Sequence, residues 1–498
     1  MLVTSLSSVI RGSFWLYVGG LFSSFLGYLY WFVASAFVSP SVVGLAAAVI
    51  SLQSVLIGVF SFGLPTGIQR FIGLSKGEND YRRLYTYFFT SLFFTVFVNS
   101  VLALSIVVLS FAGLGLFNLS SFDLSFVSIL IVLGGWPSLF VSLFNSTLRT
   151  ELTALSQALS SILRLIVGVL LLYIGLDFVG VMLGFMVASI SVDGFLLFYG
   201  IKLFRSFKVK VSLKFSSLKD ALKAGMASWF PDVLMILGQS LGVLSIYGFI
   251  GGSETGLYYI AFAIASIVYI LPGSVLGLMF PVLSGMRDGR KRAISRAVQF
   301  SLAITVPLAL VLALYSSVPL SLLGKRYVEA STMLSILALG ALISPIVSGY
   351  GSYIYAIGKY SHVILLGLTG NLSRIVLYIL LIPLFEAKGV ALAYSLGFLL
   401  SLVAMVFSAY KTGYILSWMQ YAKIISIPSL FAIVIYFSNL YWLIGLPLLL
   451  FLSFFAYTRL RIVSRADLME LSQAFMSEEQ ISKMYVHAKP IIKFIFGD

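Results

Sequence analysis

Four ionisable side chains lie within long apolar segments of the sequence. They are Arg164, Arg374, Asp193 and Asp232. Because a charge inside a bilayer is costly, ionisable residues at such positions usually bind substrates, ions or one another. The chemistry that they indicate is noncovalent: recognition of a charged group, or coupling to a cation or a proton. These residues are therefore the first candidates for a functional site.

The composition places them in a membrane protein. The 498-residue chain is 60% hydrophobic and 10% charged, with a mean hydropathy of +1.07, whereas a soluble chain carries about 25% charged residues. Its apolar runs are continuous, which is typical of transmembrane helices rather than of barrel strands. We expect an all-α polytopic protein with about fourteen transmembrane helices. They are expected at 13–37, 43–67, 84–110, 125–147, 154–174, 178–201, 226–249, 256–280, 297–316, 331–355, 361–383, 388–409, 421–438 and 440–458.

The distribution of basic residues predicts the orientation. With the N-terminus inside, the outer loops hold only Lys325, Arg326 and Lys388. Nearly all the other lysines and arginines, from a total of 32, fall in inner segments. Because positive charge favours the cytoplasmic side, we expect a multi-pass plasma-membrane protein with both termini in the cytoplasm. The net charge of +15 then reflects loops facing anionic lipids, and we expect no nucleic-acid partner.

The sequence lacks the residues that metal binding, nucleotide binding and catalysis by cysteine require. Cysteine is absent, and His362 and His487 have no metal-ligand spacing. No nucleotide-binding fingerprint occurs. We therefore expect no metal site, no cofactor and no catalytic residues. The expected outer loops are also too short for the external domain that a sugar-transferring membrane enzyme usually needs.

The chain contains an internal repeat. Gly44-Leu45, which opens one expected span, matches Gly256-Leu257, and Arg164 matches Arg374 within two similar segments. Further matches are Pro137 with Pro345 and Gly180-Val181 with Gly389-Val390. Each copy holds six spans, so both copies enter the membrane from the same side. Repeats of this kind are typical of secondary transporters, which bind substrates at the repeat interface.

The repeat predicts the domain organisation. Residues 1–202 form an N-terminal six-helix bundle, and residues 226–410 form a second one. An amphipathic cytoplasmic linker, 203–225, joins them. Residues 411–458 add two further spans, and residues 459–498 form an amphipathic cytoplasmic tail.

Three segments resemble a known family. "IPLFEAKGVALAYSLG", "LLGKRYVEASTMLSILAL" and "GGSETGLYYIAFAI" are similar to segments of Wzx-type polysaccharide flippases. These belong to the polysaccharide branch of the multidrug/oligosaccharidyl-lipid/polysaccharide exporter superfamily. The resemblance covers the first twelve spans. It implies a V-shaped transporter with a central cavity between two six-helix bundles. Many relatives carry Asp-Arg in span 7, where this chain has Gly242 and Val243, so a role for that pair is not carried over.

The resemblance also implies an activity and partners. The chain would flip a polyprenyl-type lipid-linked oligosaccharide from the cytoplasmic to the external leaflet. Its partners would be this substrate, membrane lipids and glycan assembly enzymes. The implied pyrophosphate linker would require cationic side chains, so Arg374 and Arg164 become candidates for phosphate binding. The alternative for Arg374 is pairing with backbone carbonyls or with Asn371.

The other candidates have their own roles and alternatives. Asp193 lies at nearly the depth of Arg164, which favours an ion pair between them. Asp232 is a candidate for coupling a cation or a proton, or else a hydrogen-bonded residue near the inner interface. Arg70 and Gln69, at the inner end of span 2, are candidates for a cytoplasmic gate, although Arg70 is also placed to snorkel.

Other functions remain open at this point. An ion-coupled small-molecule or multidrug exporter of the same superfamily is the main alternative. It predicts acidic residues in the first-half cavity, and span 1 contains none. A membrane enzyme or a purely structural subunit is a further alternative.

Overall fold

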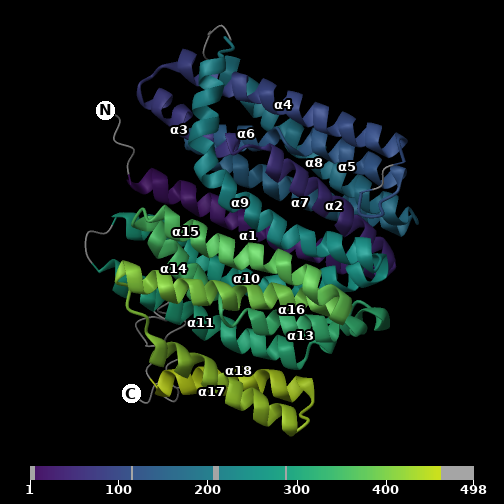
Figure 1. The fold of residues 1–498 in the computed structure, drawn as a ribbon, viewed down its shortest axis with the longest axis vertical. Coiled ribbons are helices and arrows are strands. Elements are labelled where there is room, and N and C mark those ends of the chain that lie inside the picture. The colour runs from purple at the N-terminus through teal and green to yellow at the C-terminus, as the bar shows by residue number, and fades with distance from the viewer. Residues whose placement is uncertain (1–5, 114–115, 206–211, 286–288, 461, 463–498) are drawn as a thin grey trace, which may run out of the picture. The chain divides into compact units, whose positions relative to one another are not determined.

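The computed structural model describes residues 6–113, 116–205, 212–285, 289–460 and 462, which appear as coloured ribbon in Figure 1. Every regular element of this part of the chain is helical, which confirms the predicted all-α class. The chain divides into two compact units. Unit 1 contains Met1–Ala263 and Arg374–Val390, and unit 2 contains Ile264–Ser373 and Ala391–Asp498.

The helices are assigned to the units as follows. Unit 1 contains α1 (Leu6–Phe37), α2 (Pro40–Phe60), α3 (Leu64–Gly77), α4 (Tyr81–Phe111), α5 (Ser121–Gly134), α6 (Pro137–Ser146), α7 (Thr150–Tyr173), α8 (Asp177–Arg205) and α9 (Phe215–Phe249). Unit 2 contains α11 (Arg290–Leu314), α12 (Ser317–Ser321), the 3₁₀-helix η1 (Lys325–Ala330), α13 (Ser331–Gly340), α14 (Ser344–Ala356), α15 (Tyr360–Gly367), the π-helix η2 (Leu368–Leu372), α17 (Trp418–Phe437) and α18 (Trp442–Arg459). Two helices, α10 (Gly252–Gly285) and α16 (Ser373–Thr412), contribute residues to both units.

The number of membrane crossings agrees with the sequence. Twelve helical segments of the described chain are long and apolar enough to cross a membrane, and α13 with the preceding η1 forms a bent pair with α14 that also qualifies. One of the twelve, Tyr360–Thr412, has 53 residues. At about 1.5 Å per residue it is far longer than the roughly 30 Å hydrocarbon layer. It therefore supplies two crossings, which brings the total to the expected fourteen or so.

The long segment turns at Glu386. This residue has a φ of 53° and a ψ of −137°, so the helical path is interrupted there. The chain then returns against itself, because a Cβ added to Gly389 would lie 2.3 Å from the carbonyl oxygen of Leu381. In the first repeat, Asp177 likewise has a positive φ of 40°, and Gly180 approaches Leu171. The matching residues Gly180 and Gly389 thus lie at matching hairpins.

The repeat has a pseudo-two-fold contact at the crossing of α2 and α10. A Cβ on Gly44 would lie 1.9 Å from the carbonyl oxygen of Gly252, and one on Gly256 would lie 1.8 Å from that of Pro40. Gly44 matches Gly256 in the repeat, and Pro40 matches Gly252 by the same spacing. Equivalent residues of the two copies therefore contact one another reciprocally within unit 1.

Matching spans are broken at matching positions. Between α5 and α6 the helix is interrupted before Pro137, and between α13 and α14 it is interrupted before Pro345. Proline lacks an N–H group, so it is favoured at the start of a helix. Span 2 was expected to run to residue 67, but α2 ends at Phe60 and α3 begins at Leu64. Gly63, at a φ of 69°, and Pro65 at the start of α3 explain this break.

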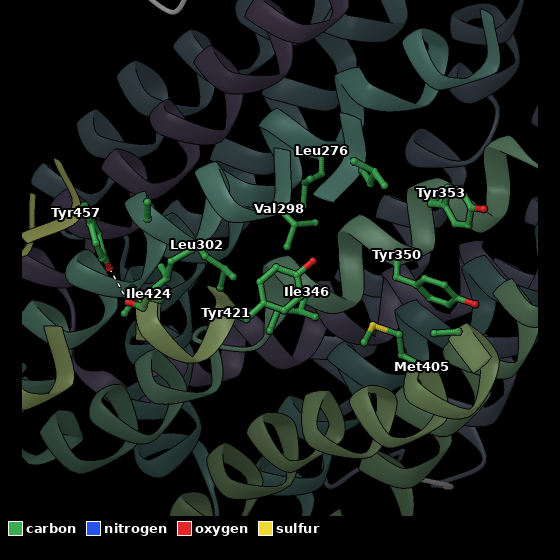
Figure 2. Packing of buried hydrophobic residues seen from close by; sticks show 14 of the residues in the cluster. Leu276, Val298, Leu302, Ile346, Tyr350, Tyr353, Met405, Tyr421, Ile424 and Tyr457 are labelled. Atoms are coloured by element: carbon green, nitrogen blue, oxygen red, sulfur yellow. Dashed lines mark hydrogen bonds between the residues drawn. The ribbon is translucent and has the colours of Figure 1, made fainter. Parts of the chain in front are cut away.

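Unit 2 has a core of buried aliphatic and tyrosine side chains (Figure 2). Leu276, Val298 and Ile346 represent the parts that α10, α11 and α14 contribute. The two extra C-terminal helices join this core, because Tyr421 and Tyr457 are buried in it. The hydroxyl of Tyr457 donates to the carbonyl of Ile424 at 2.7 Å, which ties α18 to α17. The predicted spans 13 and 14 are therefore part of the folded unit.

Parts of two predicted cytoplasmic segments fall outside the described residues. Residues 463–498 of the tail and 206–211 of the linker belong to this group. The end of the linker, from Phe215, is the first part of the 35-residue α9.

Candidate functional site

Arg164 lies in an aromatic cage within unit 1. It occupies the middle third of α7, and its guanidinium carbon is 5.6 Å from the ring centre of Tyr30 and 4.9 Å from that of Phe185. These rings come from α1 and α8 and meet edge to face, with centroids 5.7 Å apart. A cation over aromatic faces in a desolvated site gains about 2 kcal/mol. The cage therefore stabilises a charge that the apolar surroundings oppose.

Glycines make room for this cage. A Cβ on Gly168 would lie 2.6 Å from the Cε2 atom of Tyr30, and one on Gly27 would lie 3.0 Å from a terminal nitrogen of Arg164. A Cβ on Gly184 would lie 2.8 Å from the Cα atom of Gly168. Small residues allow membrane helices to approach closely. The sequence of α1, α7 and α8 thus positions the arginine and its rings together.

The hydrogen-bond donors of Arg164 are not used within the described chain. Its Nε atom is buried without a hydrogen-bond partner, and no other donor of this side chain reaches an acceptor there. The hydroxyl of Tyr30, which is fully buried, also lacks a partner. A guanidinium has five N–H donors, which suit a carboxylate or a phosphate. The arrangement can therefore bind an oxyanion.

Asp193 is not the partner of Arg164 in this structure. It is 7% exposed, on α8, and its Oδ1 atom has no hydrogen-bond partner among the described residues. The two side chains form no ion pair. Neither the half-buried Arg164 nor the buried Asp193 has a counter-ion among the described residues, which is costly within a membrane span unless function requires it.

Arg374 lies in the first arm of α16 and is 5% exposed. A π-helical turn, Leu368–Leu372, precedes it directly, and such turns are frequent at functional sites. One helical turn later, the hydroxyl of Tyr378 donates to the carbonyl of Gly238 on α9 at 2.6 Å. Residues four positions apart share a helix face, so Arg374 belongs to the face of α16 that packs on α9.

Gly242 and Val243 occupy the place in span 7 where many relatives are expected to carry Asp-Arg, and α16 packs against this place. A Cβ on Gly242 would lie 2.9 Å from Val390 and 3.1 Å from the ring of Tyr378. Helix α16 thus packs closely where relatives are expected to carry Asp-Arg. The intramembrane cations of this chain lie instead on α7 and α16.

The remaining candidates occupy different surroundings. Asp232 is exposed on α9, directly after Pro231. Arg70 and Gln69 are exposed on α3, a helix separate from α2. The amide of Gln69 donates to Ser142 on α6 at 3.3 Å, and Arg70 lies over the ring of Phe71. Near them, a Cβ on Gly67 would lie 2.0 Å from the carbonyl oxygen of Ala221, so α3 crosses α9 closely.

Two uncharged polar residues face the break between α5 and α6. A Cβ on Gly134 would lie 2.9 Å from the side-chain nitrogen of Gln53, and one on Gly135 would lie 1.8 Å from that of Asn99. Asn99 is 4% exposed, and its Nδ2 atom has no acceptor among the described residues. Polar side chains at a broken span are typical of transporters.

The sequence analysis did not single out the aromatic partners of Arg164. Tyr30, Phe185 and Tyr259 are three of many aromatic residues, and nothing in their spacing marks them. Tyr259 of α10 belongs to the same group, because its ring is 5.0 Å from that of Trp31, the neighbour of Tyr30. The glycines on α1, α7 and α8 were the signal in the sequence that could have indicated this cage, because each lies at a close contact between helices.

Several solved structures share this fold. A lipid II flippase, MurJ, in an inward closed conformation, has a TM-score of 0.75 and 18% identity, covering 89% of this chain and 99% of its own. A multidrug resistance MATE family transporter, inward-facing, has a TM-score of 0.61 and 15% identity, covering 77% and 94%. A MOP superfamily transporter from Pyrococcus furiosus has a TM-score of 0.51 and 15% identity, covering 81% and 95%.

The sequence comparisons identify the family. No curated protein matches the sequence. The profile of one family, described as "Polysaccharide biosynthesis protein", matches residues 33–332, which is more than half of the chain. This range includes α2 to α11 and Arg164, and it ends before Arg374. The predicted resemblance is confirmed: the chain belongs to the polysaccharide biosynthesis protein family and has the fold of the MOP superfamily transporters.

Proposed function

We propose that the protein is a flippase that moves a polyprenyl-type lipid-linked oligosaccharide from the cytoplasmic to the external leaflet. Arg164 is the observation that carries this proposal. Its charge lies within a span, held by two rings, and its donors are left for a ligand. A pyrophosphate linker has the charge and the oxygen geometry that such a guanidinium binds. Arg374, its repeat equivalent, is the second proposed phosphate contact.

Alternating access is the proposed mechanism. In unit 1, α2 touches the second repeat near both of its ends. Gly44 touches α10. Gly63, in the turn between α2 and α3, touches Gly225 of α9, with an added Cβ 2.4 Å from its carbonyl oxygen. The indole of Trp229 also donates to the carbonyl of Val59 at 3.0 Å. Opening one contact while the other stays closed would expose the site to one side at a time. Arg70 and Gln69 lie beside the second contact, where a cytoplasmic gate is proposed.

A small-molecule or multidrug exporter is the alternative. The likeness to MATE structures, at 15% identity, concerns the fold. An exporter of cations would require acidic groups where this chain has Arg164. Asp193 and Asp232 are proposed instead to couple transport to a cation or proton gradient. Glycan assembly enzymes are the proposed protein partners, and the proposed location is the plasma membrane with both termini in the cytoplasm.

A deletion strain tests the proposal. Its lipids are extracted and analysed by mass spectrometry for lipid-linked oligosaccharide, and its surface glycan is quantified. We expect accumulated precursor and lost surface glycan. Complementation with Arg164→Gln should leave surface glycan at least about tenfold below wild type, because charge-assisted hydrogen bonds to the phosphate are lost. Arg164→Lys should restore part of it.

Arg82→Gln is the matched control, because Arg82 is an exposed arginine at the start of α4. It should complement fully at equal protein level. Normal precursor and normal surface glycan in the deletion strain, with new drug sensitivity, would favour the exporter. Full activity of Arg164→Gln would remove Arg164 from the substrate site.

A further inference from the structure

A second basic site lies at the ends of the spans of unit 1. A pocket of about 110 Å³ is lined by residues of α3, α4, α8 and the turn before α7. One buried water requires about 10–15 Å³ of such space, so the pocket has room for a larger polar group. The lining residues are Lys76, Tyr81, Leu84, Tyr85, Thr147, Arg149, Leu203 and Phe204. Arg164, in contrast, lies in the middle of its span.

Two cations share this pocket. The Nζ atom of Lys76 donates to the carbonyl of Thr147 at 2.6 Å, which holds the amine at the turn between α6 and α7. The side chain of Arg149 makes no hydrogen bond or ion pair with the described residues. Burial, and then the charge of Arg149, lower the pKa of Lys76 below its ordinary value. The two charges therefore oppose one another without a bound anion between them.

The neighbouring carboxylates are engaged elsewhere or face solvent. Glu78 forms an ion pair with Arg83 at 3.0 Å, and Asp80 accepts from the backbone nitrogen of Arg83 as the N-cap of α4. Glu151 is exposed and forms no ion pair with Arg149. No acidic residue lines the pocket. The half-buried Lys76 and the exposed Arg149 therefore leave a net positive charge at the pocket.

The walls beside the two cations are apolar and firmly held. The hydroxyl of Tyr85 donates to the carbonyl of Phe204 at 2.8 Å, and the two rings are 4.9 Å apart. Candidate spans begin at Tyr81 and Thr150, and another ends at Arg205. The pocket thus lies at membrane-interface level, on the face that the basic loops predict to be cytoplasmic. An apolar wall and paired cations at this level suit a phosphate that is attached to acyl chains.

We propose that Lys76 and Arg149 form a binding site for the phosphate of an anionic membrane lipid. Arg149 supplies free guanidinium donors, Lys76 a fixed ammonium, and the leucine and aromatic walls contact the glycerol and upper acyl chain. The bound lipid would join α3 to the turn before α7. This site is separate from the proposed transport site, and its occupancy does not depend on the transported substrate.

Lipid binding to the purified full-length protein tests the proposal. Binding of phosphatidylglycerol is titrated by native mass spectrometry in neutral detergent, and the thermal midpoint is recorded in parallel. Phosphatidylcholine and glycerol 3-phosphate are the comparison ligands. We expect phosphatidylglycerol to bind and to raise the thermal midpoint, and the other two to do neither. Arg149→Gln should weaken the binding of phosphatidylglycerol about tenfold or more, and the double variant Lys76→Gln/Arg149→Gln should abolish this binding.

Arg82→Gln/Lys202→Gln is the matched control. It removes the same charge from two exposed positions that do not line the pocket, so binding should persist. Arg149→Gln breaks no hydrogen bond of the described chain, and Lys76→Arg keeps the charge. If Lys76→Gln does not fold, these two variants still report on lipid binding. Equal loss in the control and pocket variants would mean diffuse surface attraction and overturn the site. Binding of glycerol 3-phosphate as tight as that of the lipid would assign a soluble phosphate ligand instead. Absence of phosphatidylglycerol binding would also overturn the proposal.

Discussion

At the scale of single residues, Arg164 and Asp193 of unit 1 are stabilised in different ways. Arg164 has two aromatic faces and no hydrogen-bond acceptor, whereas Asp193 has a carboxylate oxygen with no donor among the described residues. A structural ion pair would have satisfied both at once. Because the chain keeps them apart, each costs free energy that folding alone does not require. Their separation favours roles that involve groups from outside the protein.

Asp193→Asn tests the coupling role of the carboxylate. The amide has nearly the same shape and costs less to bury than a charge, so we expect an unchanged or higher thermal midpoint. Transport, measured as surface glycan in the complemented deletion strain, should fall at least about tenfold. Asp177→Asn, on the same helix but exposed, is the control and should be silent. A loss of stability together with intact transport would identify Asp193 as a structural residue.

At the scale of elements, short hairpins and broken spans set the positions of the arginines. The turn at Glu386 returns α16 so closely that Gly389 touches the backbone of Leu381. Gly180 has a looser version of this contact, with its nearest backbone atom at 3.2 Å. Both hairpins follow the arginine-bearing stretch of their repeat. The depth of each arginine in the membrane is therefore fixed by the length of helix before a turn.

The hairpins predict a graded response to alanine. Gly389→Ala should destabilise the protein by about 1–3 kcal/mol, because its Cβ would overlap a carbonyl that cannot move independently. Gly180→Ala should cost less. Gly351→Ala, at a helical position with nothing within 4 Å of an added Cβ, should be neutral or stabilise by up to about 1 kcal/mol. Thermal unfolding of the three purified variants gives the order, and an equal effect of all three would contradict the close hairpin.

Much of the arrangement of the helices was predictable from the sequence, whereas the candidate site was predictable only in part. The all-α class, the crossings and the repeat follow from apolar run length and from paired motifs such as Gly180-Val181 with Gly389-Val390. Arg164 and Arg374 were found because a charge in an apolar run is conspicuous. Tyr30 and Phe185 were not, because aromatic residues are common in spans and their convergence depends on helix packing. The break at Gly63 was missed because the run "VFSFGLPTGI" carries no charge and continues the apolar segment before it.

At the scale of the whole molecule, the contact between Gly44 and Gly256 joins equivalent segments of the two repeats. Backbone touches backbone there, with no side chain between. Every larger residue at either position would hold the helices apart. In the proposed cycle this crossing is the external gate.

A disulfide across this crossing tests the gate. The chain has no cysteine of its own, so Ser41→Cys/Gly252→Cys introduces the only pair of thiols. A Cβ on Gly252 would lie 3.5 Å from the Cα atom of Ser41, which is close to disulfide geometry. Oxidation should stop transport and reduction should restore it, measured as surface glycan during a timed recovery. The single variants are the controls, and undiminished transport by fully cross-linked protein would contradict alternating access.

The hairpin at Glu386 also has a consequence for biosynthesis. Its two arms are joined by so short a turn that one arm is not expected to insert into the bilayer before the other. We expect them to enter the bilayer together, with Glu386 and Lys388 as an acid and a base in one turn that offset one another's charge. The apolar surface of both arms then offsets the free-energy cost of inserting Arg374. If the arms inserted separately, the apolar surface of one arm would have to offset this cost. The sharp turn therefore allows a cation to be built into the middle of a span.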